Sequence, residues 1–210
     1  MRTILITGFE PFGGETVNAS WEAAKKLEGW RHDGFTAVAR LLPCAYNASV
    51  RKLIHEIEAI GPAALLMTGQ AARRAVICVE RFAHNLDDAT APDNDGDLRR
   101  ALRISRAAPE WLEASASASA IARAMKDAGI PARMSRNAGA FVCNHLYFGA
   151  LQYLSGKRLA IPAVFVHVPV TPEQTPPGAS AKRMTPAKAA DALRLAAATM
   201  MDLSKLAETA

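Results

Sequence analysis

The sequence predicts an α/β fold with three layers, in which helices cover both faces of a mainly parallel sheet. Short apolar segments alternate with segments whose apolar residues recur at helical spacing, and glycine or proline stands at many boundaries. The strand-like segments are apolar along most of their length, as in strands buried on both faces. The chain has 210 residues, half of them hydrophobic and 21% charged, which suits one domain with a sizeable core, and we assign residues 1–210 to that domain.

The amino-terminal part of the chain contributes three expected strands and two expected helices. The first strand runs directly into a glycine-rich loop at residues 8–14. Apolar residues at helical spacing indicate the second helix, which Gly61 and Pro62 stop. We expect strands at residues 2–7, 35–42 and 63–67, and helices from Asn18 or Ser20 to about residue 28 and from Asn47 or Ser49 to residue 60.

The carboxyl-terminal part continues the alternation. Residues 75–86 have the pattern of one long strand, and the polar residues 87–97 follow it as a surface loop. The Ala-Ser repeat at residues 114–120 indicates the start of a helix that ends near residue 128. We further expect strands at residues 132–135 and 163–170, helices from Cys143 to about residue 154 and from Thr185 and Pro186 to about residue 206, and a Pro-rich loop, interpreted as a flexible cover, at residues 171–180.

Composition and charge exclude several functional classes. The net charge of +5 is spread over many short positions without a basic run interleaved with aromatics, so nucleic acid is not an expected partner. No apolar run reaches the roughly 18 residues of a membrane span, so no membrane association is expected. Cys44, Cys78 and Cys143 are odd in number and widely spaced, which argues against a disulfide framework or a zinc site and indicates a reduced, cytoplasmic compartment.

Cys143 is the candidate nucleophile because it stands where a turn passes into a helix. Unpaired backbone N–H groups and the helix dipole at such a junction lower the pKa of a thiol from about 8.5 toward or below neutrality. The thiolate is the form that attacks carbonyl groups. The structural alternative is a free cysteine that serves as a small buried hydrophobic residue.

Glu80 and His167 are polar residues inside apolar strands. A carboxylate in a sheet is costly to bury without a partner, so Glu80 is either an edge-strand residue facing water beside Arg81 or a carboxylate that holds a histidine. His167 stands near the carboxyl end of its strand, where the turn that carries Cys143 is also expected. The alternative for His167 is a hydrogen-bonded core residue.

The glycine-rich loop carries two aromatic residues and no phosphate-binding signature. It lacks both the G-x-G-x-x-G and the Gly-Lys-Ser/Thr pattern. Phe9 and Phe12 either fold back into the core or form the walls of a pocket for a flat, neutral ligand. The acidic stretch at residues 93–97 has the wrong spacing for a calcium loop and lacks its bidentate Glu.

Four motifs follow one another along the chain. They are Thr7-Gly-Phe-Glu-Pro-Phe-Gly-Gly14, then Glu80-Arg81 with Asn85, Asp87-Asp88-Ala89 and Pro92-Asp93-Asn94, then Ala138-Gly-Ala-Phe-Val-Cys143-Asn144 with Tyr147, and last Phe165-Val-His167-Val-Pro169. Each motif is modestly specific, but together, in this order, they resemble the pyroglutamyl peptidase I, or pyrrolidone-carboxylate peptidase, family of cysteine peptidases. The resemblance covers nearly the whole chain.

The resemblance implies an αβα sandwich around a twisted sheet, with a catalytic triad of Cys143, His167 and Glu80. It also implies that the chain removes an amino-terminal pyroglutamyl residue from peptides through a thioester, without a metal or other cofactor, and often as a homotetramer. Phe9, Phe12 and Val142 match positions that line the pocket of the family.

Gln70, at the end of a strand beside the glycine-rich loop, offers a hydrogen-bond donor and acceptor for the edge of a lactam.

The chain departs from the family pattern at two positions. Ala19 stands where the family commonly has Pro, and Thr90 stands where it commonly has Arg. The change at Thr90 bears on the rim of the pocket and on stabilisation of the tetrahedral intermediate. Two alternatives therefore stay open, namely a cysteine amidase that acts on another small amide and a lactam-binding homologue with impaired catalysis.

Overall fold

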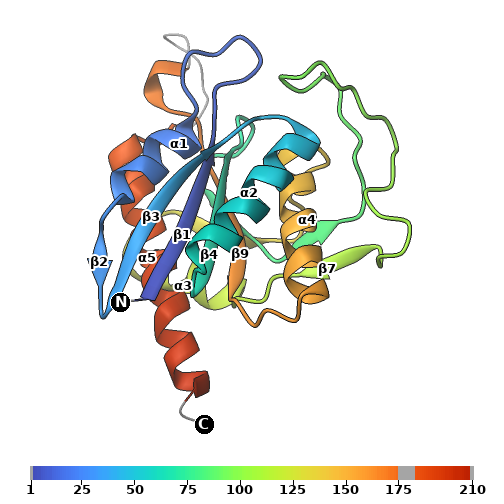
Figure 1. Ribbon diagram of the computed structural model, residues 1–210. Helices are drawn as coiled ribbons and strands as arrows, with labels where there is room; N and C mark the ends of the chain where they lie inside the picture. Colours follow the sequence, from blue (N-terminus) through green and yellow to red (C-terminus); the bar gives the residue numbers. More distant parts are fainter. Residues whose placement is uncertain (1, 175–182, 209–210) are drawn as a thin grey trace.

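The computed structural model describes residues 2–174 and 183–208, and a central sheet runs through the described part of the chain (Figure 1). The order of its seven strands is β2-β3-β1-β4-β9-β5-β8. The last strand in sequence thus lies between two earlier ones. The strands of this sheet are β1 (Arg2–Phe9), β2 (Arg31–His32), β3 (Phe35–Leu42), β4 (Ala64–Gln70), β5 (Ile77–Glu80), β8 (Ala132–Ser135) and β9 (Ala163–Val168).

Helices cover both faces of the sheet and make the three layers that the sequence predicts (Figure 1). The first face carries α1 (Ala19–Ala24), α3 (Ala118–Asp127) and α5 (Pro186–Glu208), and the second carries α2 (Tyr46–Ile60) and α4 (Val142–Gly156). Short 3-10 turns follow α1 and β9, as η1 (Lys25–Leu27) and η2 (Pro172–Gln174). None of the helices in the described ranges is long and apolar enough to cross a bilayer.

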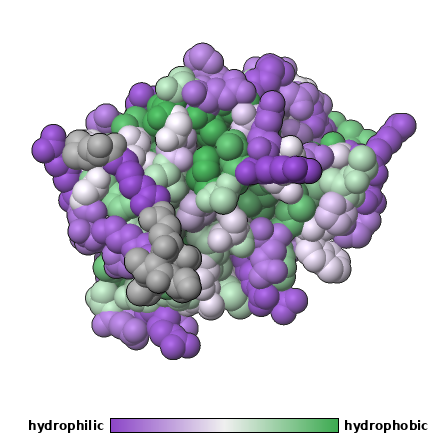
Figure 2. All heavy atoms as spheres, turned by 60° about the horizontal axis from the view of Figure 1, so that its bottom comes forward, coloured by the Kyte–Doolittle hydropathy of each residue, from purple (hydrophilic) through white to green (hydrophobic). Residues whose placement is uncertain are grey.

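Strand alternation divides the core into two apolar clusters, one under each helix layer. Ile4 and Ile6 of β1 point to the cluster under α1, α3 and α5, whereas Leu5 and Phe9 point to the cluster under α2 and α4. Each fully buried aliphatic side chain of this kind contributes about 1.5–3 kcal/mol through removal from water. Hydrophilic side chains surround the apolar ones on the lower face of the molecule, in keeping with a dispersed surface charge (Figure 2).

The direction of β5 determines which of its residues pair with His167 and its neighbours on β9. β1, β3, β4 and β9 are parallel, whereas β5 runs antiparallel to β9 and carries β8 parallel to itself. Cys78 is therefore paired with His167 and Glu80 with Phe165. Directly paired residues share a face of the sheet, so both β5 side chains point to the same layer as His167.

The expectation of one long strand at residues 75–86 is wrong. The pattern divides at Arg81 into β5 and a second strand, β6 (Phe82–His84), which pairs with β7 (Trp111–Glu113) in a separate two-stranded sheet. Arg81 makes the transfer, because its N–H donates to Ser135 O beside the main sheet while its own carbonyl accepts from Ala114 N. The sequence shows one uninterrupted strand pattern across this point, so it gives no sign that the chain passes from one sheet to the other.

Helix caps agree with the sequence at three of four sites, among them Ser117 of the Ala-Ser repeat, which caps α3 by accepting from Ala120 N. Asn18 caps α1, accepting from Ser20 N, and Thr185 Oγ1 accepts from Lys188 N at the start of α5. At α2, neither Asn47 nor Ser49 is the cap, because the helix starts earlier, at Tyr46. Of the predicted loop at residues 171–180, residues 172–174 form η2 and residues 175–180 lie outside the described residues.

Candidate active site

His167 and Glu80 form a buried hydrogen-bonded pair in the sheet. Nδ1 of His167 in β9 lies 2.9 Å from Oε1 of Glu80 in the adjacent strand β5. Glu80 is fully buried and His167 nearly so, which excludes a water-facing Glu80 on an edge strand. Because Nδ1 is engaged, the ring is held in one orientation and Nε2 is the nitrogen that can exchange a proton.

Cys143 is the second residue of α4, at the end where backbone donors are unpaired. Phe141 is the N-cap and offers no side-chain hydrogen bond to the helix. The bond from His145 N to Phe141 O closes the first turn and leaves the N–H groups before it without intrahelical acceptors. Cys143 is partly exposed, whereas Cys44 and Cys78 are buried.

The sulfur of Cys143 lies against Gly69 of β4, beside His167. A β-carbon placed on Gly69 would come within 2.7 Å of Sγ of Cys143 and 2.8 Å of Cζ of Phe165. Gly69 is paired with His167 in the β4–β9 ladder, and the rings of Phe165 and His167 are 4.8 Å apart. The three predicted residues thus share one face of the sheet, although within the described ranges no hydrogen bond joins the sulfur to the imidazole.

Burial sets the ionisation of the sulfur and the imidazole, against the sequence expectation of a thiolate. It raises the pKa of the Cys143 thiol to about 12, and the nearby Glu80 carboxylate acts in the same direction. The Arg74 cation and the backbone N–H of Cys143 itself favour the thiolate but do not outweigh burial. Burial also lowers the pKa of His167, although Glu80 opposes this. Burial therefore favours the neutral thiol and the neutral imidazole, whereas the helix start and Arg74 favour the thiolate.

Arg74 is a site residue that the sequence reasoning missed. It lies in the loop between β4 and β5, and its Nη1 is 2.5 Å from the same Glu80 Oε1 that accepts from His167. In the sequence Arg74 belongs to a pair of arginines that reads as dispersed surface charge. Its position four residues after the Gln70 that ends a strand was the available signal.

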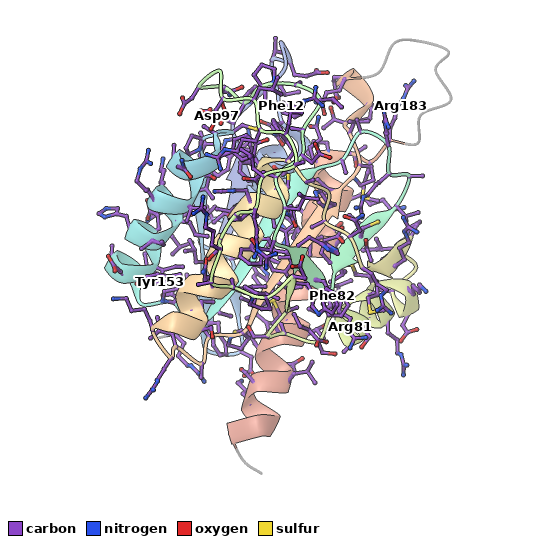
Figure 3. All side chains as sticks on the ribbon, turned by 90° about the vertical axis from the view of Figure 1, so that its right-hand side faces the viewer. Phe12, Arg81, Phe82, Asp97, Tyr153 and Arg183 are labelled. Carbon is purple, nitrogen blue, oxygen red and sulfur yellow. The ribbon has the colours of Figure 1, made fainter. Side chains whose placement is uncertain are left out.

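A cavity of about 290 Å³ opens beside the start of α4, and two aromatic rings help to line it. The rings of Phe12 and Phe141 lie 5.8 Å apart, so the loop after β1 contributes one wall and the residue before α4 the other. Figure 3 shows Phe12 at the same end of the molecule as Asp97 of the long loop, residues 85–110, that connects β6 to β7. The other residues that line the cavity are Asp88, Ala89, Thr90, Ala91 and Ala140.

The remaining predicted pocket residues lie farther back. Phe9 and Val142 are buried in the apolar cluster under α2 and α4, which also contains Phe12, so they support the wall from behind. Gln70 points toward α1, and its Oε1 accepts from Ala19 N at 2.7 Å and from Gln174 Nε2 at 2.9 Å.

A second buried polar group, also missed from the sequence, anchors the long loop that carries Thr90. Asp87 Oδ2 lies 2.8 Å from Nδ1 of His145 on α4 and accepts from Arg99 Nη1 at 2.9 Å. The Arg99 guanidinium also covers the Tyr46 ring at 4.3 Å. These contacts hold both ends of the loop against the helix that carries Cys143.

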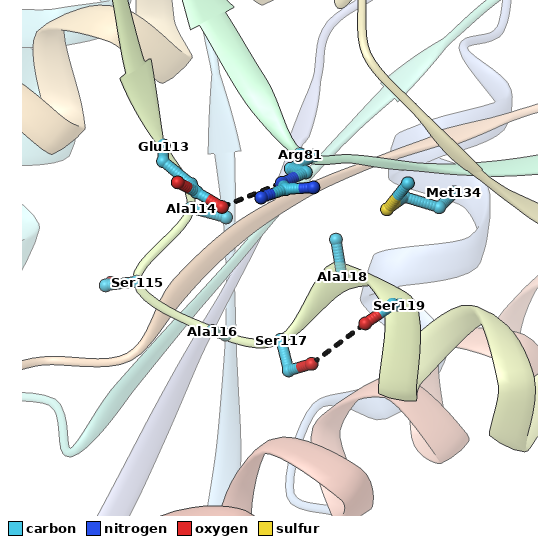
Figure 4. Close-up of a pocket in the computed structure, with 9 residues that line it drawn as sticks. All are labelled: Arg81, Glu113, Ala114, Ser115, Ala116, Ser117, Ala118, Ser119 and Met134. Carbon is cyan, nitrogen blue, oxygen red and sulfur yellow. Dashed lines mark hydrogen bonds and ion pairs between the residues drawn. The ribbon is translucent and has the colours of Figure 1, made fainter.

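A larger cavity, of about 440 Å³, lies away from this chemistry (Figure 4). It opens beside the start of α3, where Arg81 and Glu113 form an exposed ion pair at 2.7 Å. Neither the cysteine nor the histidine of the candidate site lines it, which is also true of the smaller cavity, but the smaller one includes Phe141, the residue before α4. Among the described residues no group of three or more His, Cys, Asp or Glu side chains is arranged to hold a metal ion.

Comparison with protein families gives a match over most of the chain. The family model for pyroglutamyl peptidase matches residues 2–202. The pyrrolidone-carboxylate peptidase of Enterobacter sp. (strain 638) is 41% identical over 196 residues, which is 93% of this chain and 91% of that protein. That of Chromobacterium violaceum is 43% identical over 198 residues, again 93% and 91% of the two chains.

Solved structures give the same result for the fold. Pyroglutamyl peptidase I from Bacillus amyloliquefaciens superposes with a TM-score of 0.92 at 37% identity, covering 96% of this chain and 98% of that chain. Pyrrolidone carboxyl peptidase from Thermococcus litoralis gives a TM-score of 0.94 at 32% identity, covering 98% and 96%.

Proposed function

The chain belongs to the pyroglutamyl peptidase family, and we propose that it is a cysteine exopeptidase that removes an amino-terminal pyroglutamyl residue from peptides. The observation that carries this proposal is the Glu80–His167 hydrogen bond beside the sulfur of Cys143 at a helix start. Nucleophile, base and orienting carboxylate are the parts that acyl transfer requires.

The reaction begins from the neutral thiol and imidazole. His167 Nε2 takes the thiol proton as the sulfur of Cys143 attacks the pyroglutamyl carbonyl, and a tetrahedral oxyanion forms. When the oxyanion collapses, the peptide C–N bond breaks and His167 returns the proton to the leaving amine. Water, deprotonated by His167, then hydrolyses the thioester, which releases pyroglutamate and restores the thiol. Glu80 stabilises the imidazolium that forms in each half-reaction.

The start of α4 provides the donor for the oxyanion. The backbone N–H of Cys143 lies before the first intrahelical bond and faces its own sulfur, so it also faces a carbonyl oxygen bound at that sulfur. One preorganised donor of this kind is worth about 3 kcal/mol in the transition state.

The cavity lined by Phe12 and Phe141 is the proposed site for the pyroglutamyl ring. Aromatic faces suit a flat, uncharged lactam and disfavour a charged free amine. Phe9 and Val142 shape this wall from behind. Gln70 does not face this cavity, because its side chain points toward α1 on the other face of the sheet and its Oε1 already accepts two hydrogen bonds. A polar edge left unmatched would discriminate strongly against proline.

We also propose a homo-oligomer, a tetramer as the family resemblance implies, in the cytoplasm. Large apolar side chains are exposed along residues 86–111, with Trp111 at 58% and Leu102 at 51%. Such side chains usually find a partner surface. The free state of Cys44, Cys78 and Cys143 suits a reducing compartment. Light scattering after size exclusion tests the oligomer, which Trp111→Lys should weaken.

A fluorogenic pyroglutamyl amide tests the activity. The reduced protein should cleave it, iodoacetamide should abolish cleavage, and Cys143→Ser should be folded but inactive. Cys44→Ser is the matched control and should retain activity, because its thiol is buried and neither His167 nor Glu80 is among the groups that act on it. Preferential cleavage of prolyl or glutaminyl amides would indicate an amidase instead, and binding of pyroglutamate without turnover would indicate an impaired homologue.

A further inference from the structure

Arg74 joins two parts of the site that are far apart in sequence. Its Nη1 donates to Glu80 Oε1 at 2.5 Å and to Ser135 Oγ at 3.1 Å, and its Nη2 donates to Asn137 O at 2.5 Å. The first acceptor holds the ring of His167. Ser135 is the last residue of β8, and Asn137 lies in the segment that leads from β8 into α4, the helix that carries Cys143.

The segment that receives Arg74 is itself fixed. Asn137 Oδ1 accepts from Gly139 N at 2.8 Å, and the chain enters α4 three residues later. A guanidinium presents its N–H groups in a rigid planar fork, so one side chain can hold acceptors on two segments at once. An ammonium group carries the same charge without that fixed spacing.

We propose that Arg74 is a positioning residue for the reaction, setting the placement of Glu80 and His167 relative to Cys143 by bridging β5 to the segment that leads into α4. This inference rests on the proposed function and deepens it. The guanidinium does not touch the proposed substrate cavity, which has other lining residues. It acts through the Glu80 carboxylate and through the segment that leads into α4.

Because Arg74 is charged, the pKa of His167 can distinguish its proposed role from a role in packing alone. The ionisable groups facing His167 are Glu80 and Cys78 on β5, Cys143 on α4 and Arg74 itself. Burial lowers the pKa of His167, Glu80 raises it, and the Arg74 cation adds to the lowering. Removal of the cation should therefore raise the pKa of His167.

The experiment compares Arg74→Gln and Arg74→Lys with Arg73→Gln. Arg73 is the exposed neighbour and serves as the matched control. Steady-state kinetics on a pyroglutamyl amide should show kcat reduced about 100-fold in Arg74→Gln with KM changed little, since misplacement of reacting groups by about 1 Å has such an effect. The acid limb of kcat/KM should move to higher pH, and added guanidinium should restore part of kcat.

Arg74→Lys separates charge from geometry. It should keep the acid limb near the wild-type position, because the positive charge remains, yet lose roughly tenfold or more in kcat because the fork is gone. Arg73→Gln should resemble the wild type in both measurements.

Two outcomes would overturn the inference. One is wild-type kcat in Arg74→Gln, and the other is a lower kcat with an unmoved acid limb and no guanidinium rescue. Histidine NMR titration separates this failure from failure of the proposed function. If the wild-type protein did not turn over the substrate, an unchanged pKa of His167 in Arg74→Gln would still reject the role of Arg74, and a raised pKa would support it.

Discussion

Gly69 makes room for the nucleophile by having no side chain. The sulfur of Cys143 and the ring of Phe165 occupy the space that a β-carbon would need. Gly69 is paired with His167 in the β4–β9 ladder, so its backbone cannot easily withdraw from the sulfur. The position of the sulfur therefore depends on a residue that contributes no functional group.

Gly69→Ala should inactivate the enzyme. The added methyl group would displace the Cys143 sulfur from the His167 ring, and a displacement of about 1 Å lowers the rate about 100-fold. Kinetics with a pyroglutamyl amide measure the loss, and alkylation by iodoacetamide reports the new surroundings of the thiol. Gly156→Ala, at the end of α4 with nothing within 4 Å of the new carbon, should leave the rate unchanged. Equal rates in both variants would contradict the packing argument.

The pH–rate profile should show a base that works below the ordinary histidine range. Because burial lowers the pKa of His167, kcat/KM should rise with pH through a value below about 6.5 and then reach a plateau. The thiol pKa of about 12 means that the ultraviolet absorbance of a thiolate should be absent at neutral pH. A thiolate signal at pH 7 would show a preformed ion pair instead.

The sequence predicted which polar residues come together better than it predicted their ionisation. Cys143, His167 and Glu80 stand out because polar residues in apolar strands and a cysteine at a helix start are unusual. The raised thiol pKa depends on burial by segments distant in sequence, and so does the role of Arg74. The local sequence pattern shows neither the burial of the thiol nor the contacts of Arg74.

At the scale of elements, α2 depends on a cap from another part of the chain. Its own N-cap residue, Ala45, makes no side-chain hydrogen bond to the helix. Asp93, in the long loop, accepts from Tyr46 N at 2.8 Å with one carboxylate oxygen and from Asp95 N and Asp97 N with the other. One side chain thus starts the helix and shapes the loop.

Asp93→Ala should destabilise the protein by about 1–2 kcal/mol, the usual effect of losing a helix cap. It should also reduce activity, because the same loop carries Thr90 and Ala91 of the substrate cavity. Urea unfolding and kinetics measure the two effects. Asp95→Ala is the control, since Asp95 is exposed and contributes its backbone N–H to the turn. Equal stability of the two variants would show that the cap is unimportant.

Elements with a strong local signal were predicted within a few residues, and the others were not. β3 and β8 have the predicted bounds, because turns or breaks flank clear apolar patterns. β2 and β7 were missed, since two or three partly exposed residues give no periodicity. The helix cap from Asp93 was missed for a different reason, as it joins residues far apart in sequence.

At the scale of the whole molecule, stability should fall on both sides of neutrality. His167 has a lowered pKa when folded, so its contribution is present above its unfolded value of about 6.5 and is lost as pH falls. Cys143 has a raised pKa, so its contribution is present below the ordinary thiol value and is lost as pH rises toward about 12.

Unfolding midpoints in urea across pH measure these two limbs. His167→Gln should flatten the acid limb, and Cys143→Ala should make the alkaline loss smaller. Buried Cys44 and Tyr147, whose pKa values are also raised, should keep part of that loss in the second variant. An alkaline limb unchanged by Cys143→Ala would show that the thiol does not contribute.

The fold class followed from the alternation of segments, but the arrangement of the strands did not. Periodicity indicates that a strand is buried but does not indicate which strands pair with it. The reversed direction of β5 and the position of β9 between β4 and β5 are results of tertiary pairing.

The late insertion of β9 into the sheet has a consequence for the protein during its synthesis. Until residues 163–168 leave the ribosome, β4 and β5 have no shared neighbour and the two halves of the sheet remain separate. That insertion also delivers the imidazole, so a nascent chain that already carries its cysteine has no proton acceptor beside it. We therefore expect synthesis itself to delay proteolytic competence until the final strand docks.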